Sequence, residues 1–285
     1  MNENRNLKKG VGIHARRLIA YIVLIIVSIL CLFWFYVLFI NATRSNGELQ
    51  SGFTLVPSSH LWENWKNLRN GTLPVWNGMF NSLIVSSLSA VLSVYFSTMT
   101  AYAIHAYDFK LKKYIYPFIL MIMMIPTQVT ALGFIKLVSN MNLEDSFIPL
   151  IVPTIAAPVT FFYMKQYMES TLSLEMIEAA RIDGSKEWNT FNKIILPIMK
   201  PAVATQAIFQ FIAQWNNLFT PTILLTTDSK KTLPMFVQLL SSNQFRTDYG
   251  VVYVGLFVTI IPLVVVYLVL SKYIVAGVAL GGVKG

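Results

Sequence analysis

The sequence predicts an all-α polytopic membrane protein, and two observations carry that prediction. The 285 residues are 55% hydrophobic and only 12% charged, with a mean hydropathy of +0.58, whereas a soluble domain carries about 25% charged residues. The apolar residues also gather in blocks, and a block of roughly 20 apolar residues crosses a hydrocarbon core of about 30 Å as a helix. We therefore expect a single membrane domain built from helices.

Six blocks are long enough to span, over residues 18–40, 79–103, 114–138, 147–167, 201–225 and 251–273. The first block is too long for the apolar region of a signal peptide and no small-residue cleavage site follows it, so we expect it to remain as a helix. Prolines 126, 153, 158 and 262 lie inside the predicted spans. Proline kinks suit a transporter that changes shape, but prolines are also more common in membrane helices generally.

The placement of basic residues predicts the topology. With a cytoplasmic N-terminus, most of the 22 Lys and Arg residues fall in cytoplasmic segments, as the positive-inside rule requires. We expect a basic tail over residues 1–17 that is disordered or lies on the anionic inner leaflet. A transmembrane domain over 18–275 and a cytoplasmic C-terminal tail over 276–285 follow. The net charge of +9 then reflects membrane topology and not a nucleic-acid partner.

Two longer external connections are expected. Residues 41–78 contain three tryptophans, which favours a segment lying along the membrane surface, and residues 226–250 are apolar enough around 233–240 to contain a short helix. The single cysteine, Cys31, lies in the first apolar block and is interpreted as a small buried hydrophobe.

The sequence lacks the patterns of a catalyst. It has no phosphate loop, no paired-histidine zinc motif and no Cys/His cluster, and those patterns mark nucleotide and metal sites. No predicted span carries a charge at its centre, although an ion-coupled carrier usually needs one. We expect no catalytic residue, no metal and no cofactor bound by this chain.

A polar interruption over residues 169–200 separates two apolar blocks, and its charges exclude it from the membrane. We expect a helix over 174–182 with Ser173 as its N-cap, and a turn at Asp183 and Gly184 because glycine ends helices cheaply. A second helix should run from about Ser185 and stop before Pro197, since proline disfavours a helical residue ahead of it.

The first of these helices contains two adjacent small residues, Ala179 and Ala180, flanked by Glu178 and Arg181. Small side chains leave a shallow face that another protein can approach closely, and the two charges can fix the register of the contact. The alternative is an ordinary solvated amphipathic helix. The spacing of the two alanines and the flanking charges favours a docking element.

This segment resembles the EAA loop of ATP-binding-cassette (ABC) importer permeases. The matching positions, without gaps, are Glu178, Ala179, Ala180, Gly184, Ile194, Leu196 and Pro197. The resemblance implies a type I ABC importer permease fold with six transmembrane helices. It also implies a coupling helix that sits in a cleft of a cytoplasmic ATPase, where ATP and Mg are bound by that partner. The implied ATPase-coupling residues are Glu178, Ala179, Ala180, Arg181, Asp183 and Gly184.

Within that family the chain is similar to carbohydrate-uptake permeases of the maltose type, in particular the shorter, MalG-like subunit. The features that carry this similarity are residues 179–184, Trp215-Asn216-Asn217 and the terminal Gly281-Gly282-Val283-Lys284-Gly285. The family often has an acidic residue at the position of Asn217, which removes any expected ion pair there, and a proline ahead of Glu178 is missing. The similarity implies ATPase contacts by Gly282, Val283 and Lys284, unless the terminus is simply frayed.

Amides recur every four residues in the fifth block, at Gln206, Gln210 and Gln214, and Asn217 continues this polar run. Such residues either form hydrogen bonds between helices or line a wet path suited to the hydroxyl groups of a sugar. Both interpretations stay open. Asn81, Thr127, Gln128 and Thr130 are weaker candidates by the same argument.

The resemblance implies the permease subunit of an ABC importer that takes up a carbohydrate, expected to be an oligosaccharide. Its partners would be a second homologous permease subunit in a heterodimer, two ATPase subunits, an extracytoplasmic solute-binding protein, the substrate and the lipid membrane. The 226–250 loop resembles the loop that probes the binding protein. The expected location is a bacterial or archaeal plasma membrane with both termini cytoplasmic. The alternatives are an ABC permease for a non-sugar solute and, in another class, a secondary carrier without an ATPase.

Overall fold

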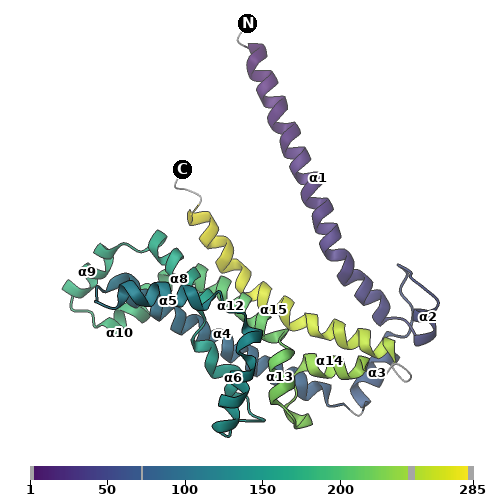
Figure 1. Cartoon of the computed structure of the whole chain (residues 1–285). Coiled ribbons are helices and arrows are strands. Elements are labelled where there is room, and N and C mark those ends of the chain that lie inside the picture. Colours follow the sequence, from purple (N-terminus) through teal and green to yellow (C-terminus); the bar gives the residue numbers. More distant parts are fainter. Residues whose placement is uncertain (1–2, 72, 243–247, 282–285) are drawn as a thin grey trace. The chain divides into compact units, whose positions relative to one another are not determined.

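The computed structural model describes residues 3–71, 73–242 and 248–281, and all regular elements in these ranges are helices (Figure 1). This confirms the all-α prediction. The chain divides into two compact units, the first made of Met1–Gly71 with Leu240–Val258 and the second of Thr72–Leu239 with Thr259–Gly285.

The first unit contains α1 (Glu3–Ala42), α2 (Asn46–Gln50), α3 (Leu61–Asn70) and the first residues of α15 (Tyr249–Gly281). Helix α1 begins at Glu3, so the expectation of disorder is wrong for residues 3–17, whereas a position on the inner leaflet stays a prediction. Residues 3–17 contain no proline and include several Lys and Arg residues, which are good helix formers, and α1 continues through them without a break.

A polar joint follows α1. Ser45 caps α2 in a capping box with Glu48, which satisfies backbone donors at the helix start. The Nδ2 atom of buried Asn64 donates to the carbonyl oxygens of Ala42 and Arg44, at 3.0 and 2.9 Å. These bonds give the segment between α1 and α3 a defined course.

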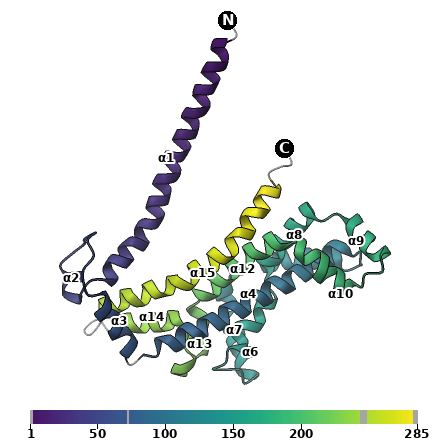
Figure 2. The same ribbon diagram turned by 180° about the vertical axis from the view of Figure 1, so that it is seen from behind.

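The second unit is organised around α4 (Val75–Ala106). Its buried face carries a row of serines, Ser82, Ser86, Ser89, Ser93 and Ser97. Small residues let helices approach closely in a membrane protein, and α4 packs along α8 (Pro158–Thr171) and α12 (Lys200–Trp215). Figure 2 shows these three helices together from behind.

The remaining elements are shorter. They are α5 (Lys112–Ile122), α6 (Thr127–Asn140), α7 (Ile148–Ile151), η1 (Val152–Ile155), α9 (Leu174–Ile182), α10 (Glu187–Thr190), the π-helix η2 (Phe191–Ile195), α11 (Leu196–Ile198), α13 (Phe219–Leu224), η3 (Asp228–Lys230) and α14 (Leu233–Ser241). Helix α14 confirms the expected short helix in the 226–250 segment.

Among the described residues, four helices are long and apolar enough to cross a membrane, or up to five if one bent pair is a single span. The six-span count is therefore not reproduced. The block over 114–138 is divided into α5 and α6, with Pro126 as the residue before α6. The block over 201–225 is interrupted between α12 and α13. Each piece is shorter than a span, because proline and the polar Asn216-Asn217 pair interrupt the helical hydrogen bonding.

The 169–200 segment forms α9, a turn, and the α10–η2–α11 run. Helix α9 has the predicted bounds, with Ser173 in the N-cap position, although its side chain makes no capping hydrogen bond. The prediction that the second helix stops before Pro197 is wrong, since α11 includes Pro197 and ends at Ile198. Pro197 is the second residue of the three-residue α11, which continues directly from η2, so the helical run reaches Ile198 although Pro197 cannot donate a backbone hydrogen bond. The direction changes after Ile198, where the run meets α12 at 80°.

Candidate functional site

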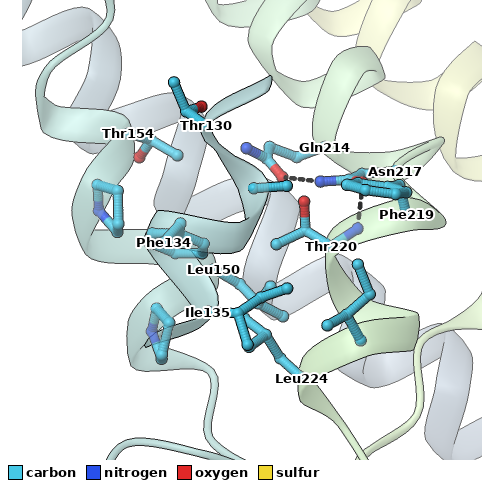
Figure 3. A pocket seen from close by; sticks show the side chains of 14 residues that line it. Thr130, Phe134, Ile135, Leu150, Thr154, Gln214, Asn217, Phe219, Thr220 and Leu224 are labelled. Carbon is cyan, nitrogen blue, oxygen red and sulfur yellow. Dashed lines mark hydrogen bonds between the residues drawn. The ribbon is translucent and has the colours of Figure 1, made fainter. Parts of the chain in front are cut away.

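A pocket of about 270 Å³ lies in the second unit between α6, the α7–η1 segment and the α12–α13 segment. Figure 3 shows Thr130 and Phe134 from α6 facing Gln214, Asn217 and Phe219 across it. The other lining residues are Ala131, Ile135, Pro149, Leu150, Pro153, Thr154, Thr220, Ile223 and Leu224. No charged residue belongs to this described lining, so the pocket combines aromatic faces with neutral hydroxyl and amide groups.

The break between α12 and α13 positions the amides. Asn217 accepts a hydrogen bond from the Thr220 backbone N–H at 3.3 Å, and its Nδ2 atom donates to Gln214 Oε1 at 3.4 Å (Figure 3). Side chains of this type cap the start of a helix. Asn217 therefore belongs to the turn ahead of α13 while it also lines the pocket.

The structure separates the four predicted path residues. Gln214 and Asn217 line the pocket, whereas Gln210 Nε2 donates to Thr160 Oγ1 on α8 at 2.6 Å and Gln206 is buried. Helix rotation of about 100° per residue moves successive fourth residues gradually around the helix. Within the amide run, Gln210 therefore bonds to a neighbouring helix, whereas Gln214 lines the pocket.

The weaker candidates for the substrate path also differ in what their side chains contact. Thr130 lines the pocket. Asn81 instead donates to the carbonyl oxygens of Ser229 and Lys231, at 2.8 and 2.9 Å, so it holds the segment around η3 against α4. The side chain of Thr127 lies outside the described residues, and Gln128 is not among the residues lining this pocket.

The second candidate region is α9 and the turn that follows it, at one end of the unit in Figures 1 and 2. Gly184 has φ +76°. The Gly184 N–H donates to the Arg181 carbonyl and the Ser185 N–H to the Ala180 carbonyl, each at 3.0 Å. This pair of bonds is the Schellman motif, which needs a left-handed residue at the position of Gly184. The predicted glycine turn is confirmed.

The two alanines of α9 do not share an exposed face. Ala179 is exposed, whereas Ala180 is 7% exposed. Ile177, three residues before Ala180 on the same helical face, joins a core cluster that includes Phe191 of η2 and Met168 of α8. The shallow face expected from both residues is therefore reduced to Ala179 alone.

The charges that flank the pair also differ. Glu178 is exposed, and its carboxylate forms no ion pair with the described residues. Arg181 is engaged within the chain: its Nε atom donates to Glu187 Oε1 at 2.8 Å, and its guanidinium carbon lies 5.1 Å from the centre of the Tyr107 ring. Asp183 is exposed beside the turn. The predicted tail contacts Gly282, Val283 and Lys284 lie outside the described residues.

Sequence reasoning missed two exposed apolar residues of the same region. Ile182 is 87% and Trp188 is 64% exposed. Large apolar side chains at a solvent-facing turn are typical of protein–protein contacts, where tryptophan often dominates the binding energy. The signal was present in the sequence, since both residues stand in an otherwise charged, non-membrane segment.

Comparison with known families gives one match that covers most of the chain. Residues 93–279 match the model of a family described as binding-protein-dependent transport system inner membrane component. That range includes the pocket, α9 and the glycine turn.

Curated relatives match nearly the full length. The chain is 34% identical to the arabinooligosaccharides transport system permease protein AraQ of Halalkalibacterium halodurans, over 87% of this chain and 89% of the relative. It is 34% identical to AraQ of Bacillus subtilis, over 90% and 92%. It is 31% identical to the sn-glycerol-3-phosphate transport system permease protein UgpE of Yersinia pestis, over 90% and 94%.

A solved structure has the same fold. It is a bacterial ABC transporter involved in the import of the acidic polysaccharide alginate, and one of its chains aligns with a TM-score of 0.78 at 22% identity. The alignment covers 91% of this chain and 96% of the other.

Proposed function

This chain belongs to the family of binding-protein-dependent transport system inner membrane components, and we propose that it forms part of the translocation path of an ATP-driven importer for a neutral carbohydrate. As a permease component of such a system it is a membrane protein that does not itself hydrolyse nucleotide. In our proposal it forms a heterodimer with a second, homologous permease, with both termini in the cytoplasm. Two ATPase subunits bind ATP and Mg, and an external binding protein supplies the oligosaccharide.

The composition of the pocket supports a neutral polyhydroxylated substrate. Two aromatic side chains, Phe134 and Phe219, offer apolar faces, while Gln214, Asn217 and Thr130 offer hydrogen-bonding groups. An anionic solute would need compensating cations in a desolvated site, and the described lining contains none. This absence of charge is the observation on which the choice of substrate class depends.

The relative that transports sn-glycerol-3-phosphate favours a second candidate, a polyol phosphate. The two candidates are separated by ATP-dependent uptake into proteoliposomes that contain the complete transporter, with its binding protein added outside. We expect uptake of a neutral oligosaccharide such as arabinotriose and none of glycerol phosphate. Uptake of glycerol phosphate alone would replace the carbohydrate proposal.

The pocket itself is tested by Asn217→Leu, which keeps the approximate size of the side chain but removes its amide. The matched control is Asn216→Leu, because Asn216 is the exposed neighbour and does not line the pocket. We expect at least a fivefold loss of uptake for Asn217→Leu at unchanged complex assembly, on the scale of about 1 kcal/mol for one lost hydrogen bond. Equal effects of both changes would argue against a substrate role.

For coupling, we propose that α9 and its turn dock on the ATPase through Glu178, Ala179 and Gly184, with Ile182 and Trp188 as apolar anchors. Ala179→Trp adds bulk at an exposed position and should abolish co-purification of the ATPase. Lys110→Trp, on the exposed loop after α4, is the matched control and should leave assembly intact. Normal assembly and transport of the Ala179→Trp protein would refute the docking role.

A further inference from the structure

Four side chains from three parts of the second unit meet beside α9. We name them the Glu187 cluster: Tyr102 near the end of α4, Tyr107 just after α4, Arg181 on α9 and Glu187 at the start of α10. Sequence analysis identified Arg181 alone, as a residue facing the ATPase.

Glu187 is the centre of this cluster. Its Oε2 atom accepts a hydrogen bond from the Tyr102 hydroxyl at 2.8 Å, and its Oε1 atom accepts from Arg181 Nε, also at 2.8 Å. The Arg181 guanidinium also lies over the Tyr107 ring, at 5.1 Å. One carboxylate therefore connects the docking helix, the element after it and the end of the central membrane helix.

The cluster is charged at neutral pH. Desolvation raises the pKa of the Glu187 carboxyl, but the neighbouring Tyr107, Arg181 and Tyr102 together lower it by more, so that its pKa lies below the ordinary value. The hydrogen bond with Glu187 raises the pKa of the already cationic Arg181. Hydrogen bonds to charged groups are the stronger kind, so both bonds of Glu187 persist at cytosolic pH.

Apolar packing alone would hold α9 less specifically. Ile177 and Phe191 join α9 and η2 to the core around α4 and α8, but apolar contact is not directional. The two bonds of Glu187 have defined donors and defined geometry. They add defined points of contact between α9, α10 and the end of α4 to the apolar packing.

We infer that Glu187 is a positioning residue that makes α9 and the cytoplasmic end of α4 move as one body, so that displacement of the docking helix reaches the membrane helices. This inference rests on the proposed coupling function. In this inference the Arg181 side chain holds Glu187 and Tyr107 of its own chain, in addition to any contact with the ATPase.

Tyr102→Phe separates this role from docking. Tyr102 is 4% exposed, so it is not available to the ATPase, and the change removes only the hydroxyl that donates to Glu187. Glu187→Ala removes both bonds. Asp108→Asn is the control, because Asp108 is an exposed carboxylate in the same loop as Tyr107 and makes no ion pair with the described residues.

The experiment uses the complete transporter with its binding protein in proteoliposomes, and measures ATP hydrolysed per substrate molecule imported. Losing a charge-assisted bond of about 1.4 kcal/mol corresponds to about tenfold in an equilibrium. We expect about a tenfold higher ratio for Glu187→Ala, a smaller rise for Tyr102→Phe and wild-type behaviour for Asp108→Asn. The double variant should match Glu187→Ala, because the two residues share one bond.

A second readout follows the motion directly. In a Cys31→Ser background, spin labels at Thr100 on α4 and Glu175 on α9, both exposed, report the distance between the two helices. We expect a narrow distribution in the parent protein and a broad one in Glu187→Ala. Unchanged distances and an unchanged hydrolysis ratio in Glu187→Ala would overturn the inference. If the parent protein neither binds an ATPase nor imports with ATP, the proposed function itself has failed.

Discussion

The turn at Gly184 allows a test that separates backbone conformation from contact with the ATPase. Gly184 has φ +76°, and a Cβ added there meets nothing within 4 Å. A substitution therefore creates no clash within the chain, and its cost is conformational alone. Alanine in the left-handed region costs roughly 1–2 kcal/mol, a β-branched residue costs more, and asparagine tolerates this region best among the larger residues.

Hydrogen exchange in the isolated subunit measures the conformational cost of each substitution at Gly184. The Ser185 N–H is protected by its bond to the Ala180 carbonyl, and that protection reports local opening. A cost of 1–2 kcal/mol corresponds to about 5- to 30-fold faster exchange. We expect the order Gly184→Val fastest, then Gly184→Ala, then Gly184→Asn close to the parent protein.

Co-purification of the ATPase with the same three variants then identifies what limits docking. If turn geometry limits it, the Asn variant assembles better than the Ala variant. If the ATPase surface lies against Gly184, the larger Asn is worse than Ala. An Ala variant with parental exchange at Ser185 would refute the conformational reasoning, because the positive φ would then carry no cost.

Three further predictions concern other parts of the molecule. Trp188→Ala should weaken ATPase binding about 30-fold, as for an interface residue worth about 2 kcal/mol, and Trp188→Phe should weaken it less. A titration of the solubilised subunit with the ATPase measures the affinity of both variants. Gly78→Ala would bring its Cβ to 2.3 Å from the fully buried Phe236 ring, so we expect a loss of about 1–3 kcal/mol, seen as a lower Tm in detergent and recovered by adding Phe236→Leu. Asp145 accepts hydrogen bonds from Thr227 that lower the pKa of its carboxyl. The hydrogen bonds between Asp145 and Thr227 therefore stay formed above the ordinary pKa of about 3.9, and they are lost only as pH falls through the lower pKa of the folded state. Exchange at the Thr227 amide should therefore be constant from pH 7 to about pH 4 after correction for the intrinsic rate, whereas Asp145→Asn should accelerate it at pH 7.

Several local features followed from the sequence because their causes are local. The bounds of α9 and the left-handed conformation of Gly184 depend on neighbouring backbone bonds. The helix in the 226–250 segment follows from an apolar run. The wrong expectation at Pro197 is also local, since proline removes one backbone hydrogen bond without always ending a helix at the residue before it, and the residues did not predict the π-helix ahead of it.

The sites depended on contacts between distant residues. Periodicity placed Gln206, Gln210 and Gln214 on one slowly turning face, but packing against α8 occupied Gln210 and left Gln214 for the pocket. Glu187 and Tyr102 are 85 residues apart in the chain, and no spacing rule relates them.

The sequence by itself determined the class of the protein, because a bilayer accepts only long apolar helices and a charged docking loop must stay outside it. The tertiary structure alone decided which of two adjacent alanines is exposed, and that Arg181 contacts Glu187 and Tyr107 of its own chain. Those outcomes depend on which helix face packs against α4 and α8, and packing is settled only when all the helices are in place.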